Sequence, residues 1–527
     1  MKNVKLKIYR SGKLICETEG VQGELLLHRL ITADVTVDAP CGGEGRCGKC
    51  LVRLSPNGEQ ILSCRTEISG DMDIYLPCET DMQISTSGTA VSSNVRQDSD
   101  FPPCHKEAQT KVPVDASTSR LGVAVDIGTT TVVAHLINLE NGVRIATASG
   151  ANVQKTYGAD VVSRIKYSIE NGHEALTHAI RTQLKNLIKQ ACTAAGAFEH
   201  NIEYISIAAN TTMAHLAAGY PPDGMGVVPF TPVSLFGEEL PAWDNLPIAK
   251  GAAVYYAPAL TAYVGGDITA GVLAAGLEDM KKSVIYLDIG TNGEIVLKHG
   301  STYYCCATAA GPAFEGAEIS NGMAAVRGAV DHVKWEGKLK LSVIGESAPV
   351  GLCGSGLLDA LAVLLETGAV DETGRLLDSS EIEHEIASYV GKCNGKPAFY
   401  LTEDLADIYV TAEDIRKLQL AKSAIAAGIQ TLLSHAGITD TQIDKLVLAG
   451  GFGSFMDKQS AARIGLFPES MLPVVQVMGN TAGEGAALAL YSKTDREKLK
   501  HIRNCCEYVE LSTHPVFNEQ FIELMTF

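Results

Sequence analysis

Four cysteines near the N-terminus have a spacing that could hold a redox metal centre. Cys41, Cys47, Cys50 and Cys64 follow the pattern Cys-x5-Cys-x2-Cys-x13-Cys. An iron–sulfur cluster binds four thiolates, and the plant-type [2Fe–2S] pattern is C-x4-C-x2-C followed by a more distant cysteine. Four glycines between the first and third cysteines would let the backbone curl tightly around a bound cluster. The spacing therefore predicts a [2Fe–2S] cluster on these four residues.

Other interpretations of the cysteines stay open at this point. Cys47-x2-Cys50 alone would suit a zinc site, although the x5 arm and the single distant Cys64 fit the paired spacing of zinc ligands poorly. The four cysteines could also be unrelated buried residues. Further cysteines could suggest a second cluster, but cysteines in apolar strands are usually small buried hydrophobes. These are Cys305, Cys306, Cys353, Cys505 and Cys506.

A second kind of chemistry is indicated by two copies of an Asp-Ile-Gly-Thr turn. In each copy a buried strand ends in an aspartate, Asp126 or Asp288, and glycine and hydroxyl residues follow. Such turns offer N–H and O–H groups to phosphates, whereas the aspartates would hold Mg²⁺ or orient a water molecule. The alternative is two purely structural turns, and no P-loop motif is present. The candidate phosphate-binding residues are Gly128, Thr129, Thr130, Gly290, Thr291, Asn292 and Gly293.

A third glycine-rich turn follows the strand-like segment 445–449. It contains Gly450, Gly451, Phe452 and Gly453. Its glycines would let the backbone lie flat against an adenosine, and a Rossmann interpretation fails because G-x-G-x-x-G does not occur here. We therefore expect this turn to complete a nucleotide site.

The elements that must position these residues form an internal duplication. Segment 202–208 matches segment 443–449, and an amphipathic helical pattern precedes each of them. The two Asp-Ile-Gly-Thr turns are a second matching pair, since a buried strand precedes each turn. Two similar α/β halves facing each other would enclose a ligand cleft. Near the N-terminus, a hairpin, a short helix, the cysteine loop and further strands, one of them around 61–65, are in the order expected of a β-grasp ferredoxin module.

Together, the two Asp-Gly-Thr turns and the Ala-Gly-Gly turn resemble the phosphate and adenosine motifs of the ASKHA superfamily, which includes actin, Hsp70 and sugar kinases. Nearly the whole chain resembles the reductive activators of corrinoid proteins. Further similar blocks include Gly158–Arg164, Asn210–His215, Gly265–Asp267, Gly311–Gly316 and Gln419–Lys422.

The resemblance implies ATP-driven transfer of one electron from the cluster to an inactive Co(II) corrinoid, which regenerates Co(I). The implied partners are the corrinoid protein of a methyltransferase or O-demethylase system and an external low-potential electron donor; a homodimer is possible. Glu315, in the Gly311–Gly316 block, would hold metal or polarise water with Asp126 and Asp288, or simply cap its loop. His215 fits a structural role as well as a functional one.

Three other functions remain open from the sequence. The chain could activate a non-corrinoid partner such as a 2-hydroxyacyl-CoA dehydratase. It could phosphorylate a small metabolite, with the cluster as an accessory. It could also be an electron carrier or nucleotide sensor without catalysis.

Composition and length set the remaining expectations. The chain has 527 residues, 46% of them hydrophobic, and a net charge of −18, which argues against nucleic acid or an anionic membrane as a partner. The sequence contains neither a signal peptide nor an apolar run long enough to span a membrane, so we expect a cytoplasmic protein. The expected parts are a β-grasp [2Fe–2S] domain (1–86), a linker (87–119), a first ASKHA-type lobe (120–280), a second lobe (281–492) and a C-terminal tail (493–527).

Overall fold

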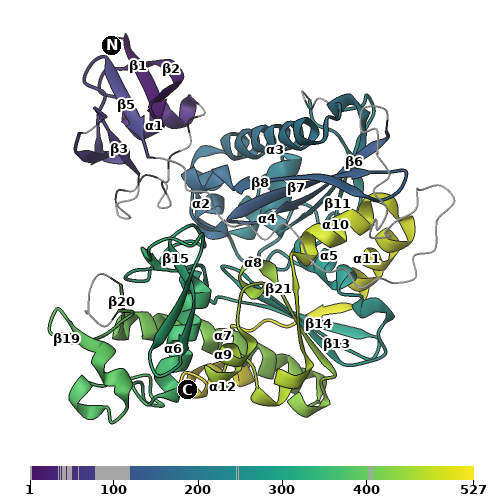
Figure 1. Cartoon of the computed structure of the whole chain (residues 1–527). Coiled ribbons are helices and arrows are strands. Elements are labelled where there is room, and N and C mark those ends of the chain that lie inside the picture. The colour runs from purple at the N-terminus through teal and green to yellow at the C-terminus, as the bar shows by residue number, and fades with distance from the viewer. Residues whose placement is uncertain are drawn as a thin grey trace.

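The computed structural model shows a small N-terminal module beside a larger two-part α/β body (Figure 1). It describes residues 3–33, 35, 37, 39, 43, 45, 50–56, 58–77, 119–244, 246, 248–402 and 408–527. The cysteines Cys41 and Cys47 lie outside the described residues, as does nearly all of the predicted linker.

The N-terminal module is a mixed sheet covered on one face by a helix. Its strands run in the order β2-β1-β5-β3-β4, with β1 antiparallel to β2 and parallel to β5. Leu26, Leu27 and Leu30 of the helix are buried against inward-facing strand residues such as Leu6 and Ile8. The elements are β1 (Asn3–Arg10), β2 (Lys13–Val21), α1 (Leu26–Thr32), β3 (Leu51–Arg53), β4 (Gln60–Leu62), η1 (Ser63–Arg65) and β5 (Met72–Leu76).

This arrangement matches the β-grasp order expected from the sequence, with one local difference. The strand expected over residues 61–65 ends at Leu62, and Ser63–Arg65 forms a 3₁₀ turn. The turn forms because the backbone N–H and the hydroxyl of Ser63 both donate to the Cys50 carbonyl, at 2.9 and 3.0 Å. These two bonds hold the segment bearing Cys64 beside Cys50.

The larger body contains two sheets with the same internal order. The first runs β10-β11-β9-β6-β7-β8 and the second β22-β21-β12-β13-β14-β23, so β11-β9-β6-β7-β8 corresponds to β22-β21-β12-β13-β14. In both, the strand ending in the key aspartate is antiparallel to the next strand and parallel to the strand on its other side. The predicted duplication is therefore confirmed.

The strands of the two sheets have the following bounds. The first sheet comprises β6 (Leu121–Ile127), β7 (Thr131–Asn138), β8 (Arg144–Ala151), β9 (Ile202–Ala209), β10 (Glu239–Pro241) and β11 (Ala253–Tyr256). The second comprises β12 (Val284–Ile289), β13 (Gly293–His299), β14 (Thr302–Thr308), β21 (Lys445–Ala449), β22 (Val475–Gly479) and β23 (Cys506–Tyr508).

The helices repeat the same symmetry. The long helices α3 (Glu174–Ala195) and α7 (Ala412–Ala436) cover equivalent strands, and each ends at a glycine in the left-handed conformation, Gly196 or Gly437. This conformation is the usual helix stop because glycine has no Cβ to clash. The amphipathic patterns of both helices were therefore interpreted correctly.

Helices α5 (Gly266–Ala274) and α10 (Thr481–Tyr491) follow β11 and β22 and lie against each other between the two sheets. A Cβ at Gly485 would overlap the backbone of Ala270, so glycine is required for this close crossing. The crossing brings the first turns of both helices to the strand ends that carry Asp126 and Asp288.

The remaining elements lie between and after these repeats. In the first half these are α2 (Val161–Asn171) and α4 (Thr211–Ala218). In the second half they are β15 (Ala329–Trp335), β16 (Leu339–Val343), β17 (Gly351–Leu352), α6 (Gly354–Glu366), β18 (Val390–Cys393), β19 (Lys396–Tyr400), β20 (Tyr409–Thr411), α8 (Gly450–Gly453), α9 (Lys458–Arg463), α11 (Lys493–Cys505) and α12 (Pro515–Glu523).

The segment after residue 492 contacts both halves: α11 packs on α5 of the first half, and the rest lies on the second half. Strand β23 pairs with β14, and α12 lies along α7. Gln419 Nε2 donates to the Met525 carbonyl, and the buried Lys422 donates to the Thr526 carbonyl at 2.5 Å. The Gln419–Lys422 block of the sequence thus holds the C-terminal segment. No helix within the described residues is long and apolar enough to cross a membrane.

Candidate functional site

The start of α10 contacts one aspartate directly and the other through Tyr286 of β12. Asn480 Nδ2 donates to Asp126 Oδ2 at 2.8 Å. The Tyr286 hydroxyl donates to Asp288 Oδ2 at 3.2 Å and shares a 2.7 Å hydrogen bond with Thr481 Oγ1. Both carboxylates are half-buried at the ends of β6 and β12. One helix start therefore fixes the aspartates of both halves.

Burial raises the pKa of four carboxyl groups in this region, and for three of them the charge of a neighbouring carboxylate adds to the rise. Burial, opposed by the Asn480 hydrogen bond and reinforced by the charge of Asp288, raises the pKa of Asp126 to about 7. Burial and the charges of Asp288 and Asp126 raise the pKa of Asp267 to about 8. Burial raises the pKa of Asp288 to about 6, and the pKa of Glu294 is raised well above its usual value by burial and the charges of Asp267 and Asp288. Such a concentration of carboxyl oxygen suits a divalent cation.

The described residues contain no group of three His, Cys, Asp or Glu side chains placed to hold a metal ion directly. Two observations therefore connect these carboxyl groups. The charges of Asp126 and Asp288 raise the pKa of Asp267, and Asn480 and Tyr286 donate hydrogen bonds to Asp126 and Asp288.

The raised pKa of Asp267 gives a stability prediction for the protein free of metal and nucleotide. The pKa of Asp267 is about 8 in the folded state, whereas the ordinary pKa of an aspartate is 3.8, so as pH rises the unfolded chain loses this proton before the folded chain does. The Asp267 carboxyl therefore lowers the free energy of unfolding, and this loss of stability grows as pH rises from about 4 to about 8. We expect Asp267→Asn to raise the midpoint of thermal unfolding, with a larger gain at pH 8 than at pH 5. An equal gain at both pH values, measured by calorimetry, would contradict the assignment.

Glu315 joins the two phosphate turns. Its carboxylate accepts a 2.8 Å hydrogen bond from Thr291 Oγ1 of the second turn and 3.3 Å hydrogen bonds from Thr130 Oγ1 of the first. Burial raises the pKa of Glu315, while both threonines and the charge of Arg164 oppose that rise. A single carboxylate from η6 (Pro312–Glu315) thus bridges the two turns.

The first phosphate turn is supported from three sides. Asn152 Nδ2 donates to the Gly128 carbonyl at 2.8 Å, and Asn210 Nδ2 donates to Thr129 Oγ1 at 3.1 Å. Arg164 Nη2 donates to the Thr129 carbonyl at 2.7 Å. Arg164 is fully buried, and burial lowers its pKa to about 10, so it stays charged at neutral pH. These contacts fix the turn before any ligand binds.

The third glycine turn touches the second aspartate directly. Gly450 has φ +85°, and a Cβ there would overlap Asp288 Oδ1 and lie 2.8 Å from the Ile289 carbonyl oxygen. Gly451 has open space around its Cβ position, and Phe452 stacks on Phe314 with ring centroids 5.0 Å apart. The turn forms the short helix α8, so its glycines lie at a helix start beside Asp288.

Gly450→Ala should therefore weaken nucleotide binding, whereas Gly451→Ala should not. Alanine at Gly450 pays about 1–2 kcal/mol for the left-handed backbone and pushes Asp288 aside. We expect a loss of about tenfold or more in ATP affinity, since small displacements of positioned groups are costly. Calorimetric titration of both variants with ATP measures this difference, and equal affinities would contradict the placement of this turn at the nucleotide site.

The cysteine site is described in part. Cys50 and Cys64 are buried, at 1% and 6% exposure, and are tied together through Ser63. Gly43 and Gly45 have φ of +91° and +76°, and the Cβ position of Gly43 lies 3.9 Å from Cys64 Cβ. Gly43 therefore lies beside Cys64, as a glycine next to a bound cluster would. Cys41 and Cys47 lie outside the described residues, and the assignment of all four cysteines as cluster ligands stays a prediction.

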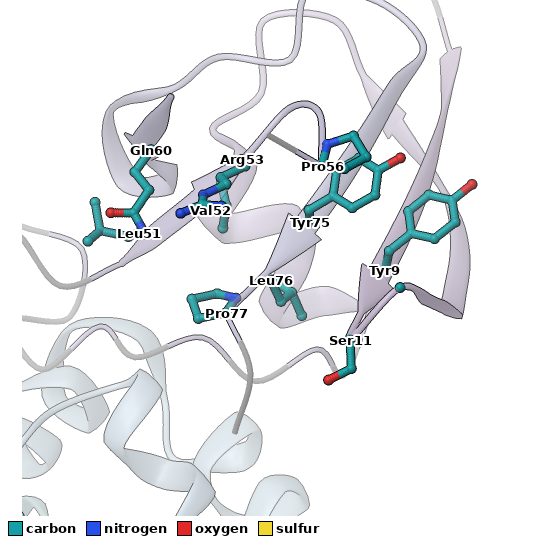
Figure 2. Close-up of a pocket in the computed structure, with 11 residues that line it drawn as sticks. Tyr9, Ser11, Leu51, Val52, Arg53, Pro56, Gln60, Tyr75, Leu76 and Pro77 are labelled. Carbon is teal, nitrogen blue, oxygen red and sulfur yellow. The ribbon is translucent and has the colours of Figure 1, made fainter. Parts of the chain in front are cut away.

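A cavity of about 570 Å³ lies in the N-terminal module, lined by residues of β1, β3, β4 and β5 (Figure 2). Its lining includes Leu51, which directly follows Cys50, and Arg53. Tyr9 and Tyr75 also line it, and their rings stack with centroids 4.8 Å apart. The strand after Cys50 thus has a concave surface beside it.

Several residues beside the two aspartates were given no individual role from the sequence. Asp267, in the Gly265–Asp267 block, and Asn480 lie at the starts of α5 and α10, and extending the duplication to these helices would have pointed to both. Tyr286 and Glu294 lie within strands without a distinctive motif, so no sequence signal marked them.

Other candidates take structural places. His215 Nδ1 donates to the Thr211 carbonyl at 2.7 Å, and its Nε2 accepts from the Val233 N–H at 3.0 Å. Cys305 and Cys306 are fully buried in β14 and Cys353 is buried at the start of α6, in agreement with the structural interpretation.

Comparison with known proteins identifies the family. Residues 121–280 match the model of the RACo middle region, and residues 282–527 match that of the C-terminal ASKHA domain of RACo. The corrinoid activation enzyme RamQ of Eubacterium limosum is 33% identical over 92% of this chain and 92% of its own length. This chain belongs to the family of reductive activators of corrinoid proteins.

Two further family members agree with this assignment. A Methanosarcina barkeri reductase, named for the Co(II) methylated amine-specific corrinoid protein, is 24% identical over 76% of each chain. The solved structure of a reductive activator for a corrinoid, iron–sulfur protein is 30% identical, covers 99% of this chain and 98% of its own, and superposes with a TM-score of 0.71. The duplicated α/β body of this reductive activator is thus an ASKHA-type body.

Proposed function

We propose that this reductive activator uses ATP to drive one electron onto the Co(II) corrinoid of a partner protein, which restores Co(I) for methyl transfer. The observation that carries the proposal is Glu315, which accepts hydrogen bonds from both Asp-Ile-Gly-Thr turns in a chain that also carries the cysteine module. Nucleotide entering between the turns would have to alter this bridge, so its binding would change the relative position of the two halves.

We propose specific roles for the residues around this bridge. Asp126 and Asp288 would hold Mg²⁺ through water, and Glu315 would polarise the attacking water. The hydroxyls and backbone N–H groups of the two turns would bind the phosphates, at Gly128–Thr130 and Gly290–Gly293. The turn at Gly450–Gly453 would lie against the adenosine.

Four thiolates, those of Cys41, Cys47, Cys50 and Cys64, would hold a [2Fe–2S] cluster. A bound plant-type cluster supplies one-electron transfer near −400 mV. Reduction of Co(II) corrinoid needs a lower potential, and each uphill step of about 59 mV costs about 1.4 kcal/mol for one electron. ATP binding and hydrolysis would offset that cost by changing how the partner is held. An external low-potential donor would reload the cysteine module.

Relatives with similarity along most of the chain are named for corrinoid proteins, which favours this function over activation of a 2-hydroxyacyl-CoA dehydratase. The test is ATPase activity measured with a panel of Co(II) corrinoid proteins, sugars and carboxylates. Stimulation by one corrinoid protein, without phosphorylation of any small molecule, is the expected result. Phosphoryl transfer to a sugar or carboxylate would replace this function with that of a kinase.

A further inference from the structure

A group of exposed apolar side chains stands out on the first half of the body. Segment 226–233 reads Gly-Val-Val-Pro-Phe-Thr-Pro-Val, and Val227, Val228 and Val233 are 61%, 75% and 60% exposed. The segment packs beside α2, since the Cβ position of Gly226 lies 3.4 Å from Ile169 Cδ1. Contiguous exposed apolar side chains of this kind mark interaction sites. We call the set the apolar face; it comprises Val162, Ile169, Val227, Val228, Phe230 and Val233.

The apolar face is built on a rigid base. Met225, immediately before the segment, is buried with Ile165 of α2. Ser168 Oγ donates to Asp223 Oδ1 at 2.5 Å, and the Phe230 ring meets the Tyr263 ring edge to face at 5.3 Å. The exposed valines are therefore presented by an anchored loop, so their exposure is a feature of the fold.

Two helices connect this face to the first phosphate turn. Through α2, Arg164 holds the Thr129 carbonyl while the next residue, Ile165, packs under the segment. Through α4, Asn210 at the N-cap bonds Thr129 Oγ1, and His215 accepts the Val233 N–H. A displacement of the turn on nucleotide binding would reach the apolar face by both routes.

Helix α2, which carries Val162 and Ile169 of the apolar face, is also linked to the contact between the cysteine module and the body. Thr156 Oγ1 donates to the Val37 carbonyl at 3.1 Å, and Val37 lies on the stretch leading to Cys41. The neighbouring Tyr157 meets Tyr167 of α2 edge to face at 5.0 Å. A protein seated on α2 would thus lie beside the module that delivers the electron.

We propose that the apolar face is the docking surface for the corrinoid-protein partner. This inference rests on the proposed function. The partner that fits presents an apolar surface without a strong net charge, because the exposed Lys166 and Glu170 of α2 lie 4.0 Å apart and their opposite charges cancel. Such a surface suits a protein rather than an anionic lipid or nucleic acid. Its links to Thr129 make partner affinity depend on bound nucleotide.

The test places a charge at the centre of the apolar face. Val228→Asp is compared with Ile522→Asp, which alters a similarly exposed residue (67%) on α12. Both full-length variants are titrated, with and without ATP, against the Co(II) corrinoid protein that stimulates the wild-type ATPase most. We expect Val228→Asp to weaken binding by about tenfold or more, as for charges buried at interface centres, and to leave partner-free ATPase unchanged. Ile522→Asp should bind as the wild type does.

Each outcome separates this inference from the function on which it rests. If no corrinoid protein stimulates the wild type, the proposed function fails. If the wild type is stimulated and Val228→Asp binds the partner equally well, the docking surface is wrong. If Val228→Asp instead changes the sedimentation of the chain alone, the face joins two copies of this chain, and the partner proposal is overturned.

Discussion

Replacing Cys64 by alanine is expected to abolish electron delivery while leaving ATP hydrolysis intact. Cys64 is buried in the η1 turn that Ser63 ties to Cys50, so the variant removes a thiolate that the module cannot replace. The nucleotide turns lie in a different part of the fold, at the ends of β6 and β12. We expect Co(I) formation to fall to background and the [2Fe–2S] absorption and iron content to be lost, with the partner-free ATPase at the wild-type rate.

The matched control is Cys16→Ala in the same module. Cys16 is partly buried on β2, with its thiol 4.0 Å from the Ala33 carbonyl oxygen, and belongs to no predicted ligand set. This variant should keep two irons per chain and full activity. If Cys64→Ala kept two irons per chain and still reduced Co(II), Cys64 would not be a cluster ligand. If the wild-type chain instead contained zinc bound by four thiolates, the zinc interpretation of the cysteines would be favoured.

Glu315→Gln should slow ATP hydrolysis by about 10²–10⁴-fold, the usual contribution of a positioned acid–base group. The glutamine amide keeps the size of the side chain but lacks the negative charge of the carboxylate, which accepts hydrogen bonds from both Thr130 and Thr291. Because the phosphates would be bound mainly by the turns themselves, ATP affinity should change little. Steady-state kinetics then show a fall in kcat with KM nearly constant.

Glu318→Gln is the control, since Glu318 is exposed three positions further along the same loop. It should hydrolyse ATP normally. If Glu315→Gln raised KM and left kcat unchanged, Glu315 would only cap and close the loops, which is the alternative that its sequence left open.

The duplicated α/β arrangement could be predicted from the sequence because short apolar segments of strand length recur in the same order in both halves. Asp126 and Asp288 end equivalent buried strands, and their local Gly and Thr residues dictate the turn after each. The order of each sheet follows once those strands are paired. Residues 63–65 were mispredicted as strand because the bonds from Ser63 to the Cys50 carbonyl are long-range contacts without a local signal.

The site was predictable only where chemistry is concentrated in short motifs. Asn480 approaches Asp126 across 354 positions, and Thr130 approaches Glu315 across 185. These pairs come together because α5 and α10 cross between the sheets, a geometry that depends on close backbone packing at Gly485. The apolar face was equally hidden, since burial cannot be read from a run of valines alone.

The most direct test of the central claim is the absorption of Co(I) in an anaerobic mixture of this activator, a Co(II) corrinoid protein and a chemical reductant. With Mg-ATP the Co(I) band should grow, and without ATP it should stay at the level of the reductant alone. Full reduction without ATP, using the same electron donor, would contradict the claim that nucleotide drives the electron onto cobalt.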